Sequence, residues 1–436
     1  MYEQEEKKLT DFKNRLDEVS IPSDALDDAV MAGFYKAKKK KRPPYKIWLL
    51  QCAAAAILII GFLASVRHSP TFANYISSIP GMEKIVEMIR DDKGLLAAVE
   101  NEYYQKIGVS QEKNGLKVTI DGVIADEKGM MIFYTVESDN KEVKVTMLDA
   151  RVKGENGEDL PAVISHGIPE ESESNSYEGM VENFFQNEVE GKKFIWDVTL
   201  KEKNGFLEEH FQIPFTIPGD LKISKKIDVN QVVEVEGQRI LFKTVTIYPT
   251  RVEIHTKFDS GNTKKILGLR DLRLVDEHGE TWNRSTDIIS TKISDDEITY
   301  YLQSNYFHEP KKLYIAMNEI EAIDKDEASV VVDIKNKKIL KQPKGNVITE
   351  VDVNGEYIVF RIKANDFSSS VSFSEIKDAD GNVIQSQGIY NRLDTGKGYI
   401  QIGEQISGLS EMKGPLIFEI GSFPSYIETN QKTRIK

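Results

Sequence analysis

The sequence is poor in cysteine, whose disulfides most often stabilise small secreted domains. It contains one cysteine, Cys52, in 436 residues. A chain with a single cysteine cannot close an internal disulfide, and it offers no thiol pair for redox chemistry or for a cysteine-rich zinc site. The domains of this chain therefore have to fold without disulfides.

Motifs that mark common active sites are also missing. The six histidines form no HExxH pair, and the sequence has no GxSxG elbow, phosphate loop or CxxC pair. We therefore predict that the protein is not an enzyme and uses no cofactor. A catalytic triad scattered over the fold would escape this test, so a membrane-tethered hydrolase remains an alternative.

Two acidic clusters invite comparison with calcium sites. Residues 378–382, DADGN, begin like a calcium loop, but the glycine comes too early and no glutamate closes a 12-residue loop. Asp324, Asp326 and Glu327 match the pattern no better. Hairpin turns explain both clusters, so we predict no bound metal.

The longest apolar stretch directly follows a basic one. Residues 47–66 form a run of 20 without a formal charge, and as a helix they would rise about 30 Å, the thickness of a bilayer's hydrocarbon core. The stretch is apolar all round, unlike a core helix, and it exceeds the roughly 7–15 apolar residues of a signal peptide. We predict a transmembrane helix here, in which Cys52 is a small apolar side chain.

The flanks of this helix predict its orientation. The preceding basic run is Lys38, Lys39, Lys40, Lys41 and Arg42, whereas only Arg67 and His68 lie close on the far side. Positive flanks stay in the cytoplasm and attract anionic lipid. We therefore predict a single-pass protein of the cell membrane, with residues 1–46 cytoplasmic and residues 69–436 extracellular.

Net charge restricts the partners of the exterior part. The chain carries −13, of which residues 69–436 account for −16 because the residues before them are net positive. An acidic domain repels polyanions, so we predict no nucleic-acid partner. Together with the lack of disulfides, this composition favours a Gram-positive cell envelope over a eukaryotic secreted protein.

Residues 1–46 contain two short segments with helical periodicity. The apolar positions that we expect to bind a partner are Leu9, Phe12, Leu16, Ile21, Leu26, Val30 and Phe34. Two such helices cannot bury both apolar stripes against each other, which favours docking into a groove of a cytoplasmic protein. The alternative is a helix lying on the inner leaflet, but Asp24, Asp27 and Asp28 on the second segment disfavour it.

A helical neck is predicted beyond the membrane, over residues 69–112. Pro70 ends the transmembrane helix. Apolar residues then recur at helical spacing from Met82 to Ile89 and again from Leu95 to Tyr103. These two stripes predict two short helices that join the span to the exterior domains.

The hydrophobic period changes to two from about Asn114. Gly115, Gly237 and Gly355 open three similar stretches, 122 and 118 residues apart. Blocks of about this length with many strands and acidic turns suit β-sandwich domains. We predict a mainly β exterior of two to three sandwich-like domains, at 113–220 and 230–340 with a shorter one at 347–436.

Two segments on either side of the predicted span resemble a known family. They read IPSDALDDAVMAGFYKAKKKKR, residues 21–42, and SPTFANYISSIPGMEKIVEMIRDDKGLLAAVENEYYQKI, residues 69–107. With the span, they resemble the bacillus-type membrane-bound anti-sigma factors, the negative effectors of extracytoplasmic-function sigma factors. The domain of unknown function of that family runs from the span into the first strands, here about 45 to 140.

The resemblance implies that the cytoplasmic segment sequesters a sigma factor and that the exterior domains receive a signal of envelope stress. Ligand binding to the β domains, or a protease acting near the neck, would release the sigma factor. Many anti-sigma factors carry a zinc-binding His and Cys pair in a compact helical domain, but this chain has neither residue before Cys52. Binding must then rest on the apolar stripe, and release by thiol oxidation is not expected.

A protein of another class would share this layout. A surface-anchored binding or adhesion protein also needs a span and exterior β domains, and its cytoplasmic segment would only set the topology. Deleting residues 1–35 would then leave transcription unchanged, whereas an anti-sigma factor would lose its function.

Overall fold

The alternating apolar residues that follow Asn114 build the first sheet. Leu116, Val118 and Ile120 face the core from strand β2 (Leu116–Ala125), as a period of two requires. The computed structural model describes residues 82–139, 145–166, 175–202, 208–283, 289–363, 371–394, 398–412 and 414–436. They all belong to the compact unit Pro80–Lys436. Strands dominate these residues, which confirms the predicted mainly β class.

The predicted membrane-spanning and cytoplasmic segments lie outside the described residues. Within the described ranges, no helix is both long enough and apolar enough to cross a bilayer. The transmembrane helix over 47–66 and the helices before it therefore stay predictions.

Two short helices lie where the neck was predicted, α5 (Glu83–Ile89) and α6 (Lys93–Glu100). The Asp92 side chain caps α6 by accepting a hydrogen bond from the Leu95 amide at 2.9 Å. Residues 105–112 differ from the prediction, because they belong to strand β1 (Gln105–Lys113) and not to a helical neck. Alternating residues of β1, with Ile107 and Val109 against the core, suit the edge position that it takes beside β2.

The first sandwich consists of two antiparallel sheets around one apolar core. The five-stranded sheet has the order β1-β2-β3-β6-β5, with β3 Gly129–Ser138, β6 Ser176–Phe185 and β5 Ala162–His166. The other sheet is β4-β7-β8, with bounds Val145–Gly154, Lys193–Glu202 and Glu208–Thr216. Trp196 and Phe211 from this second sheet are completely buried in the core.

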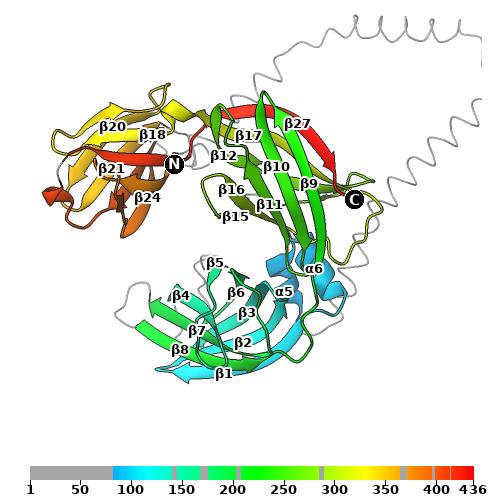
Figure 1. Cartoon of the computed structure of the whole chain (residues 1–436). Coiled ribbons are helices and arrows are strands. Elements are labelled where there is room, and N and C mark those ends of the chain that lie inside the picture. The colour runs from blue at the N-terminus through cyan, green and yellow to red at the C-terminus, as the bar shows by residue number, and fades with distance from the viewer. Residues whose placement is uncertain are drawn as a thin grey trace, which may run out of the picture. The chain divides into compact units, whose positions relative to one another are not determined.

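A second sandwich repeats this order of strands when its first sheet is followed from the opposite edge, from β9 to β15 (Figure 1). One sheet is β15-β16-β11-β10-β9, with bounds Ile289–Lys292, Glu297–Leu302, Val252–Phe258, Gln238–Ile247 and Lys225–Val235. The other contains β12 Lys264–Arg270, β17 Leu313–Asp324, β13 Arg273–Asp276, β14 Thr281–Trp282 and β27 Tyr426–Arg434. The two sheets enclose a separate core.

The third block also folds around a core of its own. One sheet is β20-β21-β25-β24, with bounds Ile348–Asn354, Tyr357–Lys363, Tyr399–Gln405 and Gly388–Asp394. The other is β19-β18-β26-β22-β23, with bounds Lys338–Lys341, Ser329–Asp333, Leu416–Ser422, Ser372–Lys377 and Val383–Ile384. Two 3-10 turns, Lys325–Glu327 and Leu409–Glu411, complete the described elements of this block.

The three regularly spaced glycines lie in equivalent hairpin turns. Gly115 connects β1 to β2, Gly237 connects β9 to β10, and Gly355 connects β20 to β21, each with a positive φ between 61° and 77°. Only glycine adopts such backbone angles without strain, which explains the spacing. The first two blocks therefore begin one strand before their glycines, earlier than predicted, whereas the third sandwich already begins with β18, in residues that were assigned to the second domain.

The last strands of the second and third sandwiches are exchanged. In the first sandwich β8 follows β7 and pairs with it. In the second, β17 is paired instead by β27, which comes from the end of the chain, and Ile427 of β27 belongs to the second core. Strand β18, which follows β17, pairs with β26 of the third sandwich. The third sandwich is thus inserted before the last strand of the second, whereas the sequence assigned residues 426–434 to the third domain.

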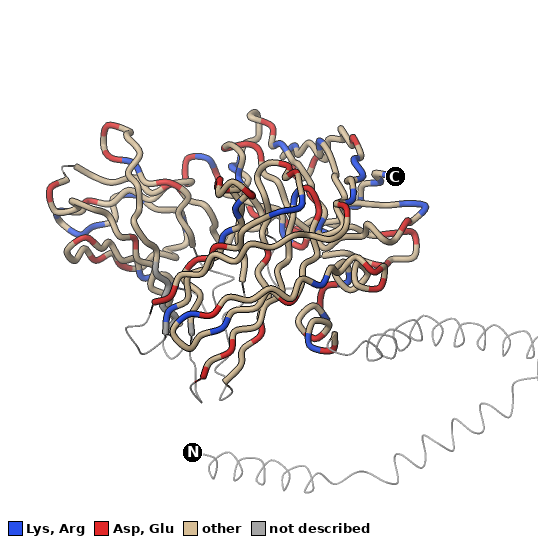
Figure 2. Tube along the Cα trace, turned by 90° about the horizontal axis from the view of Figure 1, so that it is seen from below, with Lys and Arg blue, Asp and Glu red and all other residues tan. Residues whose placement is uncertain are grey.

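Charged residues of both signs are interspersed along the described strands and loops (Figure 2). Many of them form surface ion pairs, for example Lys193 with Glu155 at 2.7 Å and Lys337 with Asp352 at 2.8 Å. Such exposed pairs add little stability. The buried polar contacts described next are more informative.

Candidate functional site

The residues predicted to bind a sigma factor cannot be placed. Leu9, Phe12, Leu16, Ile21, Leu26, Val30 and Phe34 lie outside the described residues, as does the basic run from Lys38 to Arg42. The candidate site that the structure does describe lies where the helices and the first sandwich meet the second sandwich. We call the contacts made there by Gly94, Tyr103, Asp126 and Arg251 the junction.

Helix α6 packs closely on a loop of the second sandwich. A Cβ atom at Gly94 would lie 2.6 Å from the amide nitrogen and 2.7 Å from the carbonyl oxygen of Ser304, so only glycine fits there. The Gln303 side-chain amide donates a hydrogen bond to the carbonyl oxygen of Asp91 at 2.7 Å. The segment that precedes α6 and the helix itself are therefore both held by residues 303–304.

Tyr103 connects the end of the helices to the first sandwich and to the linker before the second. Its hydroxyl donates a hydrogen bond to the carbonyl oxygen of Ala125 at 2.6 Å and accepts one from the amide of Lys222 at 3.0 Å. Its ring centroid lies 5.8 Å from that of Phe307. Burial raises the pKa of the Tyr103 hydroxyl, which keeps it protonated and able to donate.

Three aromatic rings surround the ammonium group of Lys222. The Nζ atom lies 4.6 Å from the ring centroid of Phe307, 5.0 Å from that of Tyr103 and 5.9 Å from that of Tyr306. A cation over aromatic faces at such distances is stabilised by about 0.5–1 kcal/mol at a partly exposed site. The linker is thereby held against both the helices and the second sandwich.

The carboxylate of Asp126 joins two sandwiches. One oxygen accepts hydrogen bonds from the Lys128 and Gly129 amides at 2.9 and 2.7 Å, which closes the hairpin between β2 and β3. The other accepts from the amide and the hydroxyl of Thr250 at 2.9 and 2.7 Å. The group is fully buried, and this burial raises the pKa of Asp126 although Arg251 and Thr250 favour its charged form.

Arg251 places a buried charge beside this carboxylate. Its side chain is 2 % exposed and forms an ion pair with Glu253 at 2.6 Å. The guanidinium lies over the rings of Phe184 from the first sandwich and Tyr301 from the second, at 4.7 and 5.0 Å. Its Nη1 atom has no hydrogen-bond acceptor among the described residues. A buried N–H without an acceptor costs free energy.

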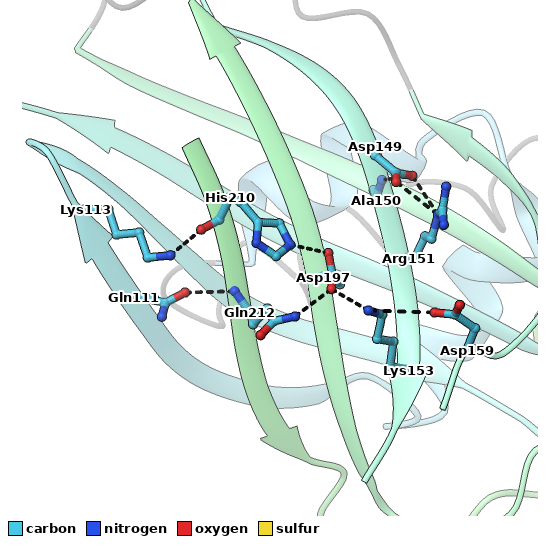
Figure 3. A network of polar contacts seen from close by, with 10 residues as sticks. All are labelled: Gln111, Lys113, Asp149, Ala150, Arg151, Lys153, Asp159, Asp197, His210 and Gln212. Carbon is cyan, nitrogen blue, oxygen red and sulfur yellow. Dashed lines mark hydrogen bonds and ion pairs between the residues drawn. The ribbon is translucent and has the colours of Figure 1, made fainter. Parts of the chain in front are cut away.

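A second polar network lies on the β4-β7-β8 sheet of the first sandwich (Figure 3). Asp197 accepts hydrogen bonds from His210 at 2.6 Å and Gln212 at 2.9 Å, and Lys153 pairs with it at 2.8 Å. Burial opposes ionisation, but these contacts outweigh it and lower the pKa of Asp197 to about 2. The residues drawn include no nucleophilic hydroxyl or thiol, so the network does not resemble a catalytic triad. Its contacts link the neighbouring strands of this sheet.

One acidic cluster among the described residues has a geometry that could hold an ion. The carboxylates of Asp324, Asp326 and Glu327 lie within 4.8 Å of one another. Lys264 already pairs with Asp324 at 2.6 Å, and Lys344 pairs with Glu327. The positive charges of these lysines offset the negative charges of the cluster, so we assign no metal ion to it.

Sequence reasoning did not identify the junction. The helical spacing from Leu95 to Tyr103 predicts no contact for Tyr103 with the sandwiches, and no sequence pattern links Asp126 to Thr250 or Arg251. A buried charge cannot be recognised from its own neighbours in the sequence, because its partner lies 124 positions away. A turn aspartate that precedes a glycine was the only available signal.

Two family comparisons bear on this region. Residues 44–138 match a family described as "Domain of unknown function (DUF4179)", and residues 224–353 match a "Family of unknown function (DUF5643)". The first match covers the predicted span, both helices and strands β1 to β3. A domain of unknown function thus lies where one was predicted, at about 45 to 140, and its description assigns no function.

No curated protein matches this chain. Among solved structures, a conserved domain protein from Bacillus anthracis is 18% identical, with 55% of this chain and 84% of that chain covered and a TM-score of 0.38. The C-terminal domain of the AgI/II polypeptide BspA from Streptococcus agalactiae is 9% identical, with 75% and 97% covered and a TM-score of 0.11. At these TM-scores, neither similarity supports a statement about this chain.

Proposed function

We propose that this chain is a single-pass membrane anti-sigma factor. Its cytoplasmic residues 1–46 hold an extracytoplasmic-function sigma factor at the membrane, and its extracellular β domains receive a signal from the envelope. The resemblance of residues 21–42 and 69–107 to the bacillus-type family supports this function, as does the match of residues 44–138 to a domain that runs from the predicted span into the first sandwich.

The contacts of the helices best support the transmission of a signal from the β domains towards the membrane. Gly94 and Tyr103 tie α6 and the segment after it to Ser304, Ala125 and Lys222. A change in either sandwich would therefore act on α5 and α6, the first described helices after the predicted span in the sequence. No catalytic step is part of the proposal, and the apolar stripe on the cytoplasmic segment is the contact with the sigma factor.

Capture of the partner by the full chain tests this function. A tagged chain is purified from membranes in mild detergent, and the bound proteins are identified by mass spectrometry. The test variant carries Leu26→Asp, Val30→Asp and Phe34→Asp. The control carries Ala25→Asp, Ala29→Asp and Ala32→Asp, which add the same charge on another face of the predicted helix.

We expect a sigma factor with the native chain and the control, and none with the stripe variant. Loss of capture in that variant should also raise expression of the genes that the sigma factor controls. Absence of any sigma factor from the native chain, with transcription unchanged on deletion of residues 1–35, would instead support a surface binding or adhesion protein.

A further inference from the structure

Strand β24 forms an open edge of the third sandwich. Its residues Gly388–Asp394 pair with β25 in a continuous register without a bulge, and no strand in the described ranges pairs with its other side. Ile389 on this strand is 62 % exposed. A regular edge strand presents a row of backbone N–H and C=O groups, and an exposed apolar side chain beside that row favours pairing with a further strand.

The other edge strands of the described sheets are covered, interrupted or short. The edges of β1 and β8 meet where the Gln212 amide donates a hydrogen bond to the Gln111 side chain at 3.0 Å. The edges of β9 and β27 meet where the Gln231 side chain donates to the carbonyl oxygen of Arg434 at 3.1 Å. Strands β4, β12 and β20 contain an irregularity in register, and β5, β14, β15, β19 and β23 have five residues or fewer. Of the edges that the structure describes, β24 is thus the one that is long, regular and not covered by another described strand.

The sequence of β24 suits antiparallel pairing with a second copy of itself. The register that pairs the whole strand is centred on Asn391, the middle residue of the seven. In this register Ile389 of one copy lies opposite Leu393 of the other, and Tyr390 lies opposite Arg392. An apolar pair and an aromatic residue opposite a cation are favourable cross-strand neighbours. A register centred on Arg392 would place two guanidinium groups opposite each other, which is unfavourable.

The local charge of the strand also permits pairing of two copies. Residues 69–436 are strongly acidic, so two copies of the exterior part repel each other at most surfaces. Strand β24 carries one cation, Arg392, and one anion, Asp394, and is therefore neutral. Two copies can approach along this edge without the repulsion that the rest of the exterior would impose.

We propose that β24 is a dimerisation strand, through which two copies of this chain pair in antiparallel orientation. The pairing joins the four-stranded sheet β20-β21-β25-β24 of each copy into one continuous sheet. The contact has two-fold symmetry, so both copies use the same residues and assembly stops at the dimer. Dimerisation would also bring two cytoplasmic segments together at the membrane, and only this consequence rests on the function proposed above.

A single cysteine at the centre of the pair tests the register. Every variant carries Cys52→Ala, which removes the natural cysteine of the chain. In the proposed dimer position 391 lies opposite itself, with the two Cα atoms about 4.5–5.5 Å apart, a separation that a disulfide can bridge. Asn391→Cys in the full chain, oxidised in membranes of the expressing cells, should therefore form a disulfide-linked dimer on a non-reducing gel. Val383→Cys is the control, because this side chain is 51 % exposed on the other sheet of the same sandwich, and it should remain monomeric.

A second pair of positions tests the direction of the strands. Ile389→Cys and Leu393→Cys lie opposite each other only between antiparallel copies, so coexpression of the two variants with different tags should give a dimer that carries both tags. Either variant alone should form little dimer, because the same position in the two copies would be about 14 Å apart along the strands. Dimer formation by Ile389→Cys alone at the level of the coexpressed pair would contradict antiparallel pairing and overturn the proposal.

A charge on the edge should prevent pairing. Ile389→Lys, combined with Asn391→Cys, should lower the yield of disulfide-linked dimer by roughly tenfold or more, whereas Val383→Lys should not lower it. Circular dichroism and thermal unfolding of the Ile389→Lys chain should match those of the native chain, which separates loss of pairing from loss of folding. A yield for Asn391→Cys no higher than for Val383→Cys, or a yield that Ile389→Lys leaves unchanged, would overturn the proposal.

The outcome is independent of the sigma factor. Cross-linking reports on the exterior strand, so a chain that captures no sigma factor can still form the dimer. Conversely, capture of a sigma factor by a chain that does not cross-link would leave the anti-sigma function standing and remove only the dimer.

Discussion

Asp126 and Thr250 are linked by two hydrogen bonds to a single carboxylate oxygen, although one residue belongs to the first sandwich and the other to the second. The other oxygen of Asp126 closes the hairpin in which the residue lies. A local turn and a contact between sandwiches thus depend on the same charged group. The contribution of Asp126 to stability should therefore be measurable as a coupling energy between Asp126 and Thr250.

A double-mutant cycle measures this coupling. Asp126→Ala leaves Thr250 without its acceptor and Arg251 without a nearby negative charge, so we expect a loss of about 3 kcal/mol in the free energy of unfolding. Thr250→Val removes only the hydroxyl. The two changes should be non-additive by roughly 0.5–3 kcal/mol in urea denaturation. The same cycle with Thr349→Val, in the third sandwich, should be additive, and coupling of equal size there would contradict the assignment.

Substitution of Gly94 should loosen the helices without unfolding the sandwiches. Gly94→Val places a side chain where the Ser304 backbone lies, and the overlap should cost about 1–3 kcal/mol unless α6 moves away. Hydrogen exchange should then become faster in residues 93–100 and 303–307 and stay unchanged in β21. Gly268→Ala is the matched control, because the nearest atom to its Cβ would lie 3.9 Å away. Unchanged exchange in the Gly94 variant would show that the contact does not hold the helix.

Acid should remove the contribution of Asp197 to the free energy of unfolding. The pKa of Asp197 is lowered to about 2 in the folded chain, against about 3.9 in an unfolded one, so its stabilisation is present above pH 4 and is lost as the pH falls towards 2. Asp197→Asn should cost about 1 kcal/mol at pH 7, less than the pKa difference implies because solvent screens His210 and Lys153. The difference between variant and native chain should shrink below pH 4. A difference that is constant from pH 7 to pH 3 would exclude an ionic contribution.

The strand exchange predicts which sandwich depends on the end of the chain. Ile427 is 5 % exposed in the second core, so Ile427→Ala should destabilise that sandwich by roughly 2–5 kcal/mol. Faster hydrogen exchange is expected first in β17 and β12, not in β21. Ile389→Ala, at a side chain 62 % exposed, serves as the control. Faster exchange confined to the third sandwich would mean that β27 does not complete the second.

Local patterns identified most of the secondary structure. Alternating residues predicted β2 and β3, helical spacing predicted α5 and α6, and the three glycines marked equivalent hairpins. These features depend on neighbours within a few positions, where backbone sterics and the period of the apolar residues decide the conformation. The boundaries were less accurate, because β1 has an amphipathic pattern too short to separate it from the preceding helices.

The sequence by itself determined the β class, the repeat of about 120 residues and the separation of a basic N-terminal segment from an acidic remainder of the chain. Only the tertiary structure decided that β27 completes the second sandwich and β18 the third, because several strands of similar composition can pair with β17 or β26. It alone also brought Asp126 to Thr250. Partners so distant in the chain are selected by packing and by the cost of leaving buried polar groups unpaired, which no local pattern records.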